Sequence, residues 1–239
     1  PDALIARYGA DTVRLYTLFI GPPEKDAEWN DRGVEGSYRF LTRYWKMVED
    51  FVEATGNGPG PVGTPKAGAA WAASGPARDL RRRIHEVAHQ ILEDMDRLHL
   101  NTAVSGLMQM VNAVQDYQTA GGSLDAPEAA EAVDMSTRLM APLAPHTAEG
   151  AWQRLGHKES VFRAPWPKVA EEARARDSLS LVVQVNGKVR YQIQVAVGAT
   201  QDAIRQTALA DPKAGRFVEG KKVVQVIYVP GRLINIVVS

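Results

Sequence analysis

The sequence contains no cysteine among its 239 residues. This absence excludes disulfide bonds, thiolate metal ligands and cysteine nucleophiles, and it is compatible with a cytoplasmic location. No apolar run approaches the roughly 18 residues that a membrane-spanning helix needs, and no signal-peptide pattern is present. We therefore expect a cytoplasmic protein that does not contact a membrane. The chain begins at Pro1 rather than Met, and we expect it to be part of a longer protein.

Motifs typical of active sites are also missing. The sequence has no P-loop, no G-x-G-x-x-G and no G-x-S-x-G pattern. The stretch from His85 to His89 does match the H-E-x-x-H helix of zinc proteases. Four nearby arginines would repel a dication, and Leu92 and Met95 stand where the extended motif has Gly and His. A zinc protease is therefore a remote alternative, and we expect no catalytic residue and no metal.

Net charge is zero, with 28 basic and 28 acidic residues, but the charge is unevenly distributed. Residues 178–239 carry eight basic and three acidic residues, a net charge of +5, which leaves −5 on residues 1–177. Hydrophobic content of 45% and charged content of 23% are typical of a soluble globular protein. A small basic region joined to a mildly acidic body indicates a polyanionic partner.

Helical periodicity dominates residues 1–167. Two short helices are expected within residues 1–32, and a long one over 33–55, capped by Asp31 and ended by Gly56. The Gly/Pro/Ala-rich stretch 56–76 is expected to form a surface loop, with Trp71 docking back. Further helices are expected over 78–100, 101–119, 126–141 and 147–155. The expected buried stripe of the long helix consists of Val34, Tyr38, Leu41, Trp45, Val48 and Val52.

After a polar stretch at 168–177, which we interpret as a linker, the apolar period changes from 3.6 to 2. Asn186-Gly187 is a strong hairpin signal and would place Val183 opposite Arg190. The predicted order is two strands, a helix and two strands, with Lys188, Arg190, Gln192 and Gln194 sharing the polar face. The expected fold class is α+β: an antiparallel helical bundle over 33–167, followed by a small ββαββ domain over 178–239.

Basic residues recur at helical spacing on the long helix and crowd the first turns of the helix at 78–100. The second arrangement is unfavourable, because the helix dipole is already positive there. Two interpretations stay open for both groups. They are solvated surface paired with acidic neighbours, or they contact phosphate.

Several segments resemble class I aminoacyl-tRNA synthetases. Residues 7–15, RYGADTVRL, are similar to the segment after the KMSKS loop of that class. GVEG at 33–36, LRR at 80–82 with His85, and APWP at 164–167 resemble the leucyl enzymes, as do VQVNGKVR at 183–190 and YVPGRL at 228–233. The order of these segments is that of bacterial-type leucyl-tRNA synthetases. Gly150 departs from the family pattern, which usually has a larger residue there.

The resemblance implies a parent enzyme that joins leucine to tRNA using ATP and magnesium. Its catalytic and editing domains would lie before Pro1, so this chain alone is expected to be inactive and to hold no cofactor. Residues 1–32 would be a connector after the KMSKS region, 33–167 an anticodon-binding-type bundle, and 178–239 a domain that reaches the tRNA corner. The expected partners are tRNA-Leu and the absent catalytic domain of the same protein, and the chain is expected to be a monomer.

The resemblance also makes phosphate contacts the favoured interpretation of the basic residues. The alternative is a protein-interaction module that docks onto the catalytic domain without binding RNA. The expected tRNA contacts are Arg39, Arg43, Lys46, Arg78, Arg81, Arg82, Arg83, Lys188, Arg190, Lys221, Lys222 and Arg232.

Overall fold

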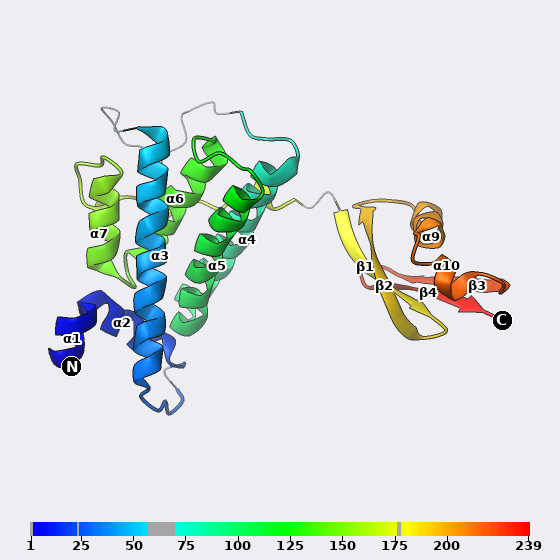
Figure 1. Cartoon of the computed structure of the whole chain (residues 1–239), viewed down its shortest axis with the longest axis horizontal. Coiled ribbons are helices and arrows are strands. Elements are labelled where there is room, and N and C mark those ends of the chain that lie inside the picture. Colours follow the sequence, from blue (N-terminus) through cyan, green and yellow to red (C-terminus); the bar gives the residue numbers. More distant parts are fainter. Residues whose placement is uncertain (1, 23, 57–69, 176–177) are drawn as a thin grey trace. The chain divides into compact units, whose positions relative to one another are not determined.

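The computed structural model describes residues 2–22, 24–56, 70–175 and 178–239 (Figure 1). The chain divides into two compact units, Pro1–Arg174 and Ala175–Ser239. The first consists of helices and the second contains a four-stranded sheet, which confirms the α+β class. No helix in these described ranges is long and apolar enough to span a membrane. Most of the expected 56–76 loop lies outside the described residues.

The first unit is a bundle in which α3 extends along α5 and is covered by α2, α6 and α7 (Figure 1). Asn30, rather than the expected Asp31, caps α3, because its side chain accepts a hydrogen bond from the Arg32 amide at 2.9 Å. The helices are α1 (Asp2–Tyr8), α2 (Ala10–Phe19), α3 (Asp31–Thr55), α4 (Gly75–Asp96), α5 (Leu100–Thr119), α6 (Pro127–Met140), α7 (Pro145–Arg154), the short 3-10 turn η1 (Val161–Arg163) and α8 (Glu171–Arg174).

The buried face of α3 differs from the predicted stripe. Tyr38 and Trp45 are 45% and 37% exposed, whereas Phe40, Tyr44 and Phe51 are almost fully buried. The reason is that helices on several sides cover α3, so its buried face is centred one position away from the predicted one. At the centre of the core the Tyr44 hydroxyl donates a hydrogen bond to the Thr137 hydroxyl oxygen at 2.8 Å. Burial raises the pKa of Tyr44.

The segment expected as a connector over residues 1–32 is part of the first unit, because its helix α2 packs against α3, α5 and α7. Leu15 and Tyr16 are buried, and Leu15 belongs to the core shared with α3 to α7. Asp11, which is 7% exposed, accepts a 2.6 Å hydrogen bond from the Thr147 amide in the first turn of α7. A carboxylate at this position satisfies an amide that the helix cannot pair internally, and it fixes α2 to α7.

The polar stretch 168–177 is also not simply a linker. The Ala170 amide donates a 3.2 Å hydrogen bond to Nδ1 of His85, and Ala173 of α8 is buried. Because α8 packs against α4, the first unit extends to Arg174. The segment is charged and has no apolar period, which indicated a linker. Its packing was not visible in that pattern, because its partners on α4 lie far away in the sequence.

The second unit is a mixed sheet whose strand order is β2-β1-β4-β3. The hairpins β1–β2 and β3–β4 are antiparallel, and β1 and β4 pair in parallel at the centre. Residues of one sheet face, among them Leu181, Ile193 and Ile236, form a separate core with Ile204 and Ala208 of α9. The elements are β1 (Ser178–Val185), β2 (Lys188–Ala196), α9 (Gln201–Ala210), an additional short helix α10 (Gly215–Val218), β3 (Val223–Val229) and β4 (Leu233–Val238).

A β-bulge changes the predicted register of the first hairpin. Val183 lies opposite Tyr191 and Gln184 opposite Val189, so Arg190 is the extra residue of β2. The guanidinium of Arg190 lies 4.9 Å from the ring centroid of Phe217 on α10, and Val189 is 65% exposed. Gln192 and Gln194 are exposed as predicted, but the predicted alternation is wrong at Val189 and Arg190, because the bulge interrupts it there.

Candidate nucleic-acid interface

Three expected contacts lie on the exposed face of α3. Arg39, Arg43 and Lys46 are all exposed. Arg43 donates a 3.0 Å hydrogen bond to the side-chain oxygen of Asn112 on α5, which orients its guanidinium over the neighbouring helix. Lys46 pairs with Asp50 at 2.7 Å, and this hydrogen bond raises the pKa of Lys46. Arg39 and Arg43 are therefore better candidates for phosphate contact than Lys46, whose charge is compensated.

Two aromatic side chains accompany these cations, although the sequence pattern assigned them to the core. Tyr38 and Trp45 are seven residues apart and lie on the exposed side of α3 beside Arg39 and Lys46. Trp45 packs over Gly150 of α7, where an added Cβ would lie 3.3 Å from the indole. A side chain at position 150 would therefore require the Trp45 ring to shift by a few tenths of an ångström. Aromatic rings interleaved with cations are typical of surfaces that bind nucleic acid.

Arg81 differs from the other arginines in the first turns of α4. Its side chain is 10% exposed, and its Nε donates a 2.9 Å hydrogen bond to Glu131 of α6. A second carboxylate, on Glu172 of α8, lies 3.4 Å from Arg81, and the Trp71 ring lies 3.9 Å from its guanidinium carbon. Its donors are directed inside the first unit, which makes Arg81 the weakest candidate for phosphate contact among the expected residues of α4.

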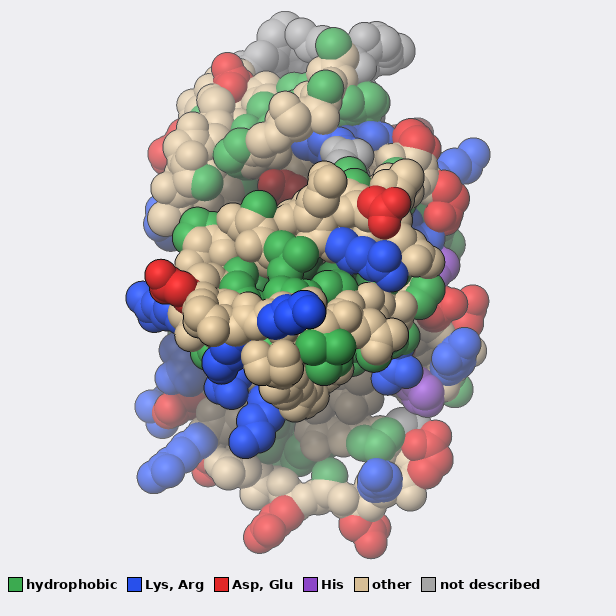
Figure 2. Space-filling view, turned by 90° about the vertical axis from the view of Figure 1, so that its right-hand side faces the viewer, with side chains coloured by type: hydrophobic (Ala, Val, Ile, Leu, Met, Phe, Trp, Pro, Cys, Tyr) green, Lys and Arg blue, Asp and Glu red, His purple; other side chains and the backbone are tan. Residues whose placement is uncertain are grey.

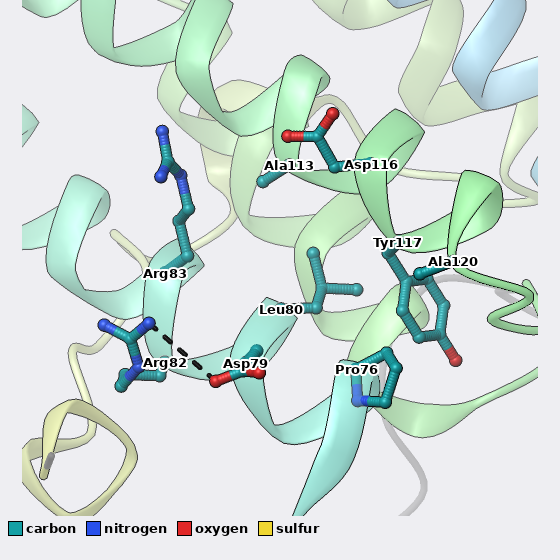
Figure 3. Close-up of a pocket in the computed structure, with 9 residues that line it drawn as sticks. All are labelled: Pro76, Asp79, Leu80, Arg82, Arg83, Ala113, Asp116, Tyr117 and Ala120. Carbon is teal, nitrogen blue, oxygen red and sulfur yellow. Dashed lines mark ion pairs between the residues drawn. The ribbon is translucent and has the colours of Figure 1, made fainter. Parts of the chain in front are cut away.

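Two of the remaining arginines of α4, Arg82 and Arg83, border a recess of about 390 Å³ between α4 and α5 (Figure 3). Arg82 is 2.9 Å from Glu86 and 3.8 Å from Asp79, so its charge is compensated. Arg83 is exposed and stands across the recess from Asp116 in Figure 3. Arg78 is half-buried and has a partner of its own. The expected cluster is therefore a mixed-charge surface in which Arg83 is the most accessible cation.

The helix α5 connects the two groups of cations. On one side Arg43 of α3 bonds to Asn112 of α5. On the other side Arg83 of α4 lines two grooves with residues of α5, one with Ala113 and the other with Gln109. The first unit therefore presents one surface, built from α3, α5 and α4. On it, exposed arginines lie on both sides of uncharged polar side chains of α5, among them Gln109 and Asn112. We call this the α3–α5–α4 face.

The expected contacts of the second unit do not form a single cluster. Lys188 follows the β1–β2 turn, and Lys221 and Lys222 precede β3. Hydrogen bonds of Asn186 to β4, and of Lys222 to Ser239, place these lysines at one end of the sheet, on its two outer strands. Arg232 lies in the β3–β4 turn at the other end. On the face of this unit that Figure 2 turns to the viewer, Lys and Arg side chains are gathered around apolar ones.

A family model described as the anticodon-binding domain of tRNA ligase matches residues 77–205, more than half of the chain. The chain belongs to this family. Its curated relatives include the leucine–tRNA ligases of Geotalea uraniireducens, 42% identical over 242 residues, and of Alkalilimnicola ehrlichii, 46% identical over 242 residues. Both alignments cover the whole of this chain but only 28% and 27% of the relative. The resemblance to the leucyl enzymes is thereby confirmed.

A solved structure supports the same fold for this member of the anticodon-binding family. It is the ternary complex of Agrobacterium radiobacter K84 agnB2 LeuRS with tRNA and LeuAMS. It matches the whole chain with a TM-score of 0.76 at 24% sequence identity, over 29% of its own length. At this identity the match establishes the architecture: the helical bundle and the small mixed sheet follow each other in both proteins.

The two histidines of the H-E-x-x-H stretch have different surroundings in this family member. His85 is 1% exposed, and its Nδ1 accepts the Ala170 amide, so the ring proton lies on Nε2, 3.0 Å from Glu131. His89 lies on the surface and faces Glu93 at 3.7 Å. Among the described residues there is no group of three or more side chains suited to hold a metal ion. His85 therefore anchors the segment before α8.

Proposed function

We propose that the chain is the tRNA-binding portion of a leucine–tRNA ligase and that the α3–α5–α4 face contacts the tRNA backbone. The alignment of the whole chain with part of the leucine–tRNA ligases supports the choice of tRNA-Leu as partner. The α3–α5–α4 face carries the proposal for the mode of binding, because the exposed Arg39, Arg43 and Arg83 flank uncharged polar side chains of α5. Guanidinium groups bind phosphate oxygens, and amide side chains bind the neighbouring sugar hydroxyl groups.

The lysines of the second unit supply further phosphate contacts in this proposal. Lys188, Lys221 and Lys222 are exposed at one end of the sheet, and this unit has a net charge of +5 over residues 178–239. We further propose that the chain acts as a monomer in the cytoplasm, is inactive alone and holds no cofactor. Leucine, ATP and magnesium would bind to the remainder of the parent enzyme, which would be the second partner of the chain.

The test is a salt titration of tRNA-Leu binding, followed by fluorescence anisotropy. Each lost phosphate contact lowers the slope of log affinity against log salt by about one unit. We expect the triple variant Arg39→Ala/Arg43→Ala/Arg83→Ala to reduce the slope by about two to three units. The matched control is Arg97→Ala, an exposed arginine at the other end of α4, which should leave the slope unchanged.

The rival function is a protein-docking module without RNA binding. It predicts no measurable affinity for tRNA-Leu, or an affinity that does not depend on salt. Either result would contradict the proposal. An ATP–pyrophosphate exchange assay with leucine, performed on the same preparation, checks the expected inactivity of the isolated chain.

A further inference from the structure

A shallow groove of about 170 Å³ lies on the first unit, where the segment after α7 crosses the end of α6. Two of its lining residues are Phe162 and Trp166, which are 60% and 52% exposed and are among the most exposed aromatic side chains of the first unit. Burying each of these rings would be favourable, since aromatic side chains carry large apolar surfaces. No residue of the α3–α5–α4 face lines this groove, so it requires an explanation of its own.

Hydrogen bonds hold the walls of the groove in place. The Glu149 carboxylate of α7 accepts bonds from the Ser160 hydroxyl at 2.9 Å and the Val161 amide at 3.0 Å, immediately before Phe162. On the other wall, Arg138 of α6 donates a 3.0 Å hydrogen bond to the carbonyl of Pro165, the residue before Trp166. Arg138 also pairs with Asp134. The backbone beside both aromatic residues is therefore fixed before any ligand arrives, which lowers the entropic cost of binding.

The size and charge of the groove define its ligand. A volume of 170 Å³ is well below that of sites for drug-sized molecules and suits one flat ring system. Arg138 lines the groove with its charge compensated by Asp134, whereas Arg163 and Lys168, in the same segment as the two aromatics, are exposed cations. Cations beside aromatic rings favour a ligand in which a flat ring is attached to a negatively charged group. A nucleobase attached to its phosphate has these properties, because bases stack on aromatic rings and phosphates pair with cations.

We propose that the groove formed by Phe162, Trp166 and Arg138 is a stacking site for one unpaired nucleobase of a bound RNA. Trp166 and Phe162 provide the stacking surfaces, and Arg163 and Lys168 contact the adjoining phosphates. This inference rests on the proposed function and adds to it a second contact, outside the α3–α5–α4 face. It applies to unpaired nucleotides, because a base within a helix cannot enter so small a groove.

The first measurement is the affinity of the full chain for an unstructured hexamer of adenosine nucleotides. Trp166→Ala should weaken binding by about tenfold, in the range found for one stacked base, and Trp166→Phe should retain affinity within about twofold. Both substitutions are at a half-exposed position, so the fold is retained, which circular dichroism verifies. Trp29→Ala is the control, since Trp29 is 47% exposed but lies before α3; its affinity should equal that of the wild type.

The second measurement is photocrosslinking to tRNA-Leu transcripts that contain 4-thiouridine, with the adduct mapped by mass spectrometry. An adduct within residues 158–168 supports the site. Equal hexamer affinity of wild type and Trp166→Ala, or Trp166-dependent binding of an acidic peptide in place of RNA, overturns it. If tRNA-Leu binding then still shows the salt dependence expected above, the proposed function stands without this site. If the wild-type chain binds neither the hexamer nor tRNA-Leu, both proposals fail.

Discussion

The Nε atom of Arg81 on α4 donates a 2.9 Å hydrogen bond to Oε2 of Glu131 on α6. This pair, with 10% and 14% of the side chains exposed, joins two helices and also positions α8 through Glu172. Sequence alone groups Arg81 with the half-buried Arg82 and the exposed Arg83, but the three side chains have different surroundings.

Replacing Arg81 should therefore affect stability rather than RNA binding. Arg81→Ala leaves the partly buried Glu131 carboxylate with His85, whose Nε2 lies 3.0 Å away, but without its charged partner, and we expect a loss of about 2–3 kcal/mol in the free energy of unfolding. Urea denaturation followed by helical circular dichroism measures this loss. The matched variant Arg83→Ala should show the opposite pattern, with unchanged stability and weaker tRNA-Leu binding. Equal stability of the two variants would contradict the assignment.

Removal of the second unit should weaken tRNA-Leu binding more than any single substitution on α3. Each unit has its own hydrophobic core, so a chain that ends at residue 177 should still fold. The deletion removes a net charge of +5, and we expect at least about a tenfold loss of affinity at 0.1 M salt. Filter binding of the truncated chain beside Arg39→Ala provides the comparison. Equal affinity of the truncated and intact chains would show that the second unit does not bind RNA.

Two helical glycines offer a matched test of packing. A Cβ added to Gly106 on α5 would lie 2.5 Å from Cγ1 of Ile91 on α4, a residue with no exposed surface. Gly106→Ala should therefore destabilise the bundle by about 1–3 kcal/mol through overpacking. A Cβ added to Gly36 on α3 has no neighbour within 4 Å.

For Gly36→Ala the gain in helix propensity is unopposed, and we expect stabilisation by about 0.5–1 kcal/mol. Thermal denaturation should shift the midpoint down for Gly106→Ala and up for Gly36→Ala. An unchanged or raised midpoint for Gly106→Ala would show that α4 can move away from α5 at little cost, and a lowered midpoint for Gly36→Ala would contradict the gain in helix propensity.

The His157 ring stacks on Trp152, with ring centroids 3.4 Å apart and planes within 5°. Burial, with a smaller effect from the charge of Arg138, holds the pKa of His157 below its ordinary value of about 6.5. The unfolded chain therefore binds more protons than the folded chain at mildly acidic pH, and this part of the stability is lost as the pH falls through about 6.5.

His157→Phe keeps an aromatic ring on Trp152 but removes the titration. Its free energy of unfolding should fall less than that of the wild type between pH 7.5 and 5.5. Urea denaturation at several pH values measures the difference between the two proteins, in which contributions from other histidines cancel. Parallel pH profiles would show that His157 can be protonated in the folded chain without cost.

The helices and strands follow from local signals, whereas the orientation of α3 does not. Large apolar side chains occur on α3 at both Tyr38 and Trp45 and at Phe40 and Tyr44, so periodicity alone is compatible with more than one buried face. The choice depends on which helices pack around α3, and those helices come from other parts of the chain. For the same reason the Asn186-Gly187 turn predicted the hairpin, but not the bulge that places Arg190 against Phe217.

The sequence by itself determined the succession of helices and strands, the α+β class, the basic character of residues 178–239 and the resemblance to the leucyl enzymes. Each depends on neighbouring residues, on composition or on short motifs. Only the tertiary structure decided which arginines are accessible. The partners of Arg81 are 50 and 91 residues away in the sequence, and Arg43 is oriented by an asparagine 69 residues away. Charge is a property of one side chain, whereas accessibility depends on contacts that form when distant segments pack together.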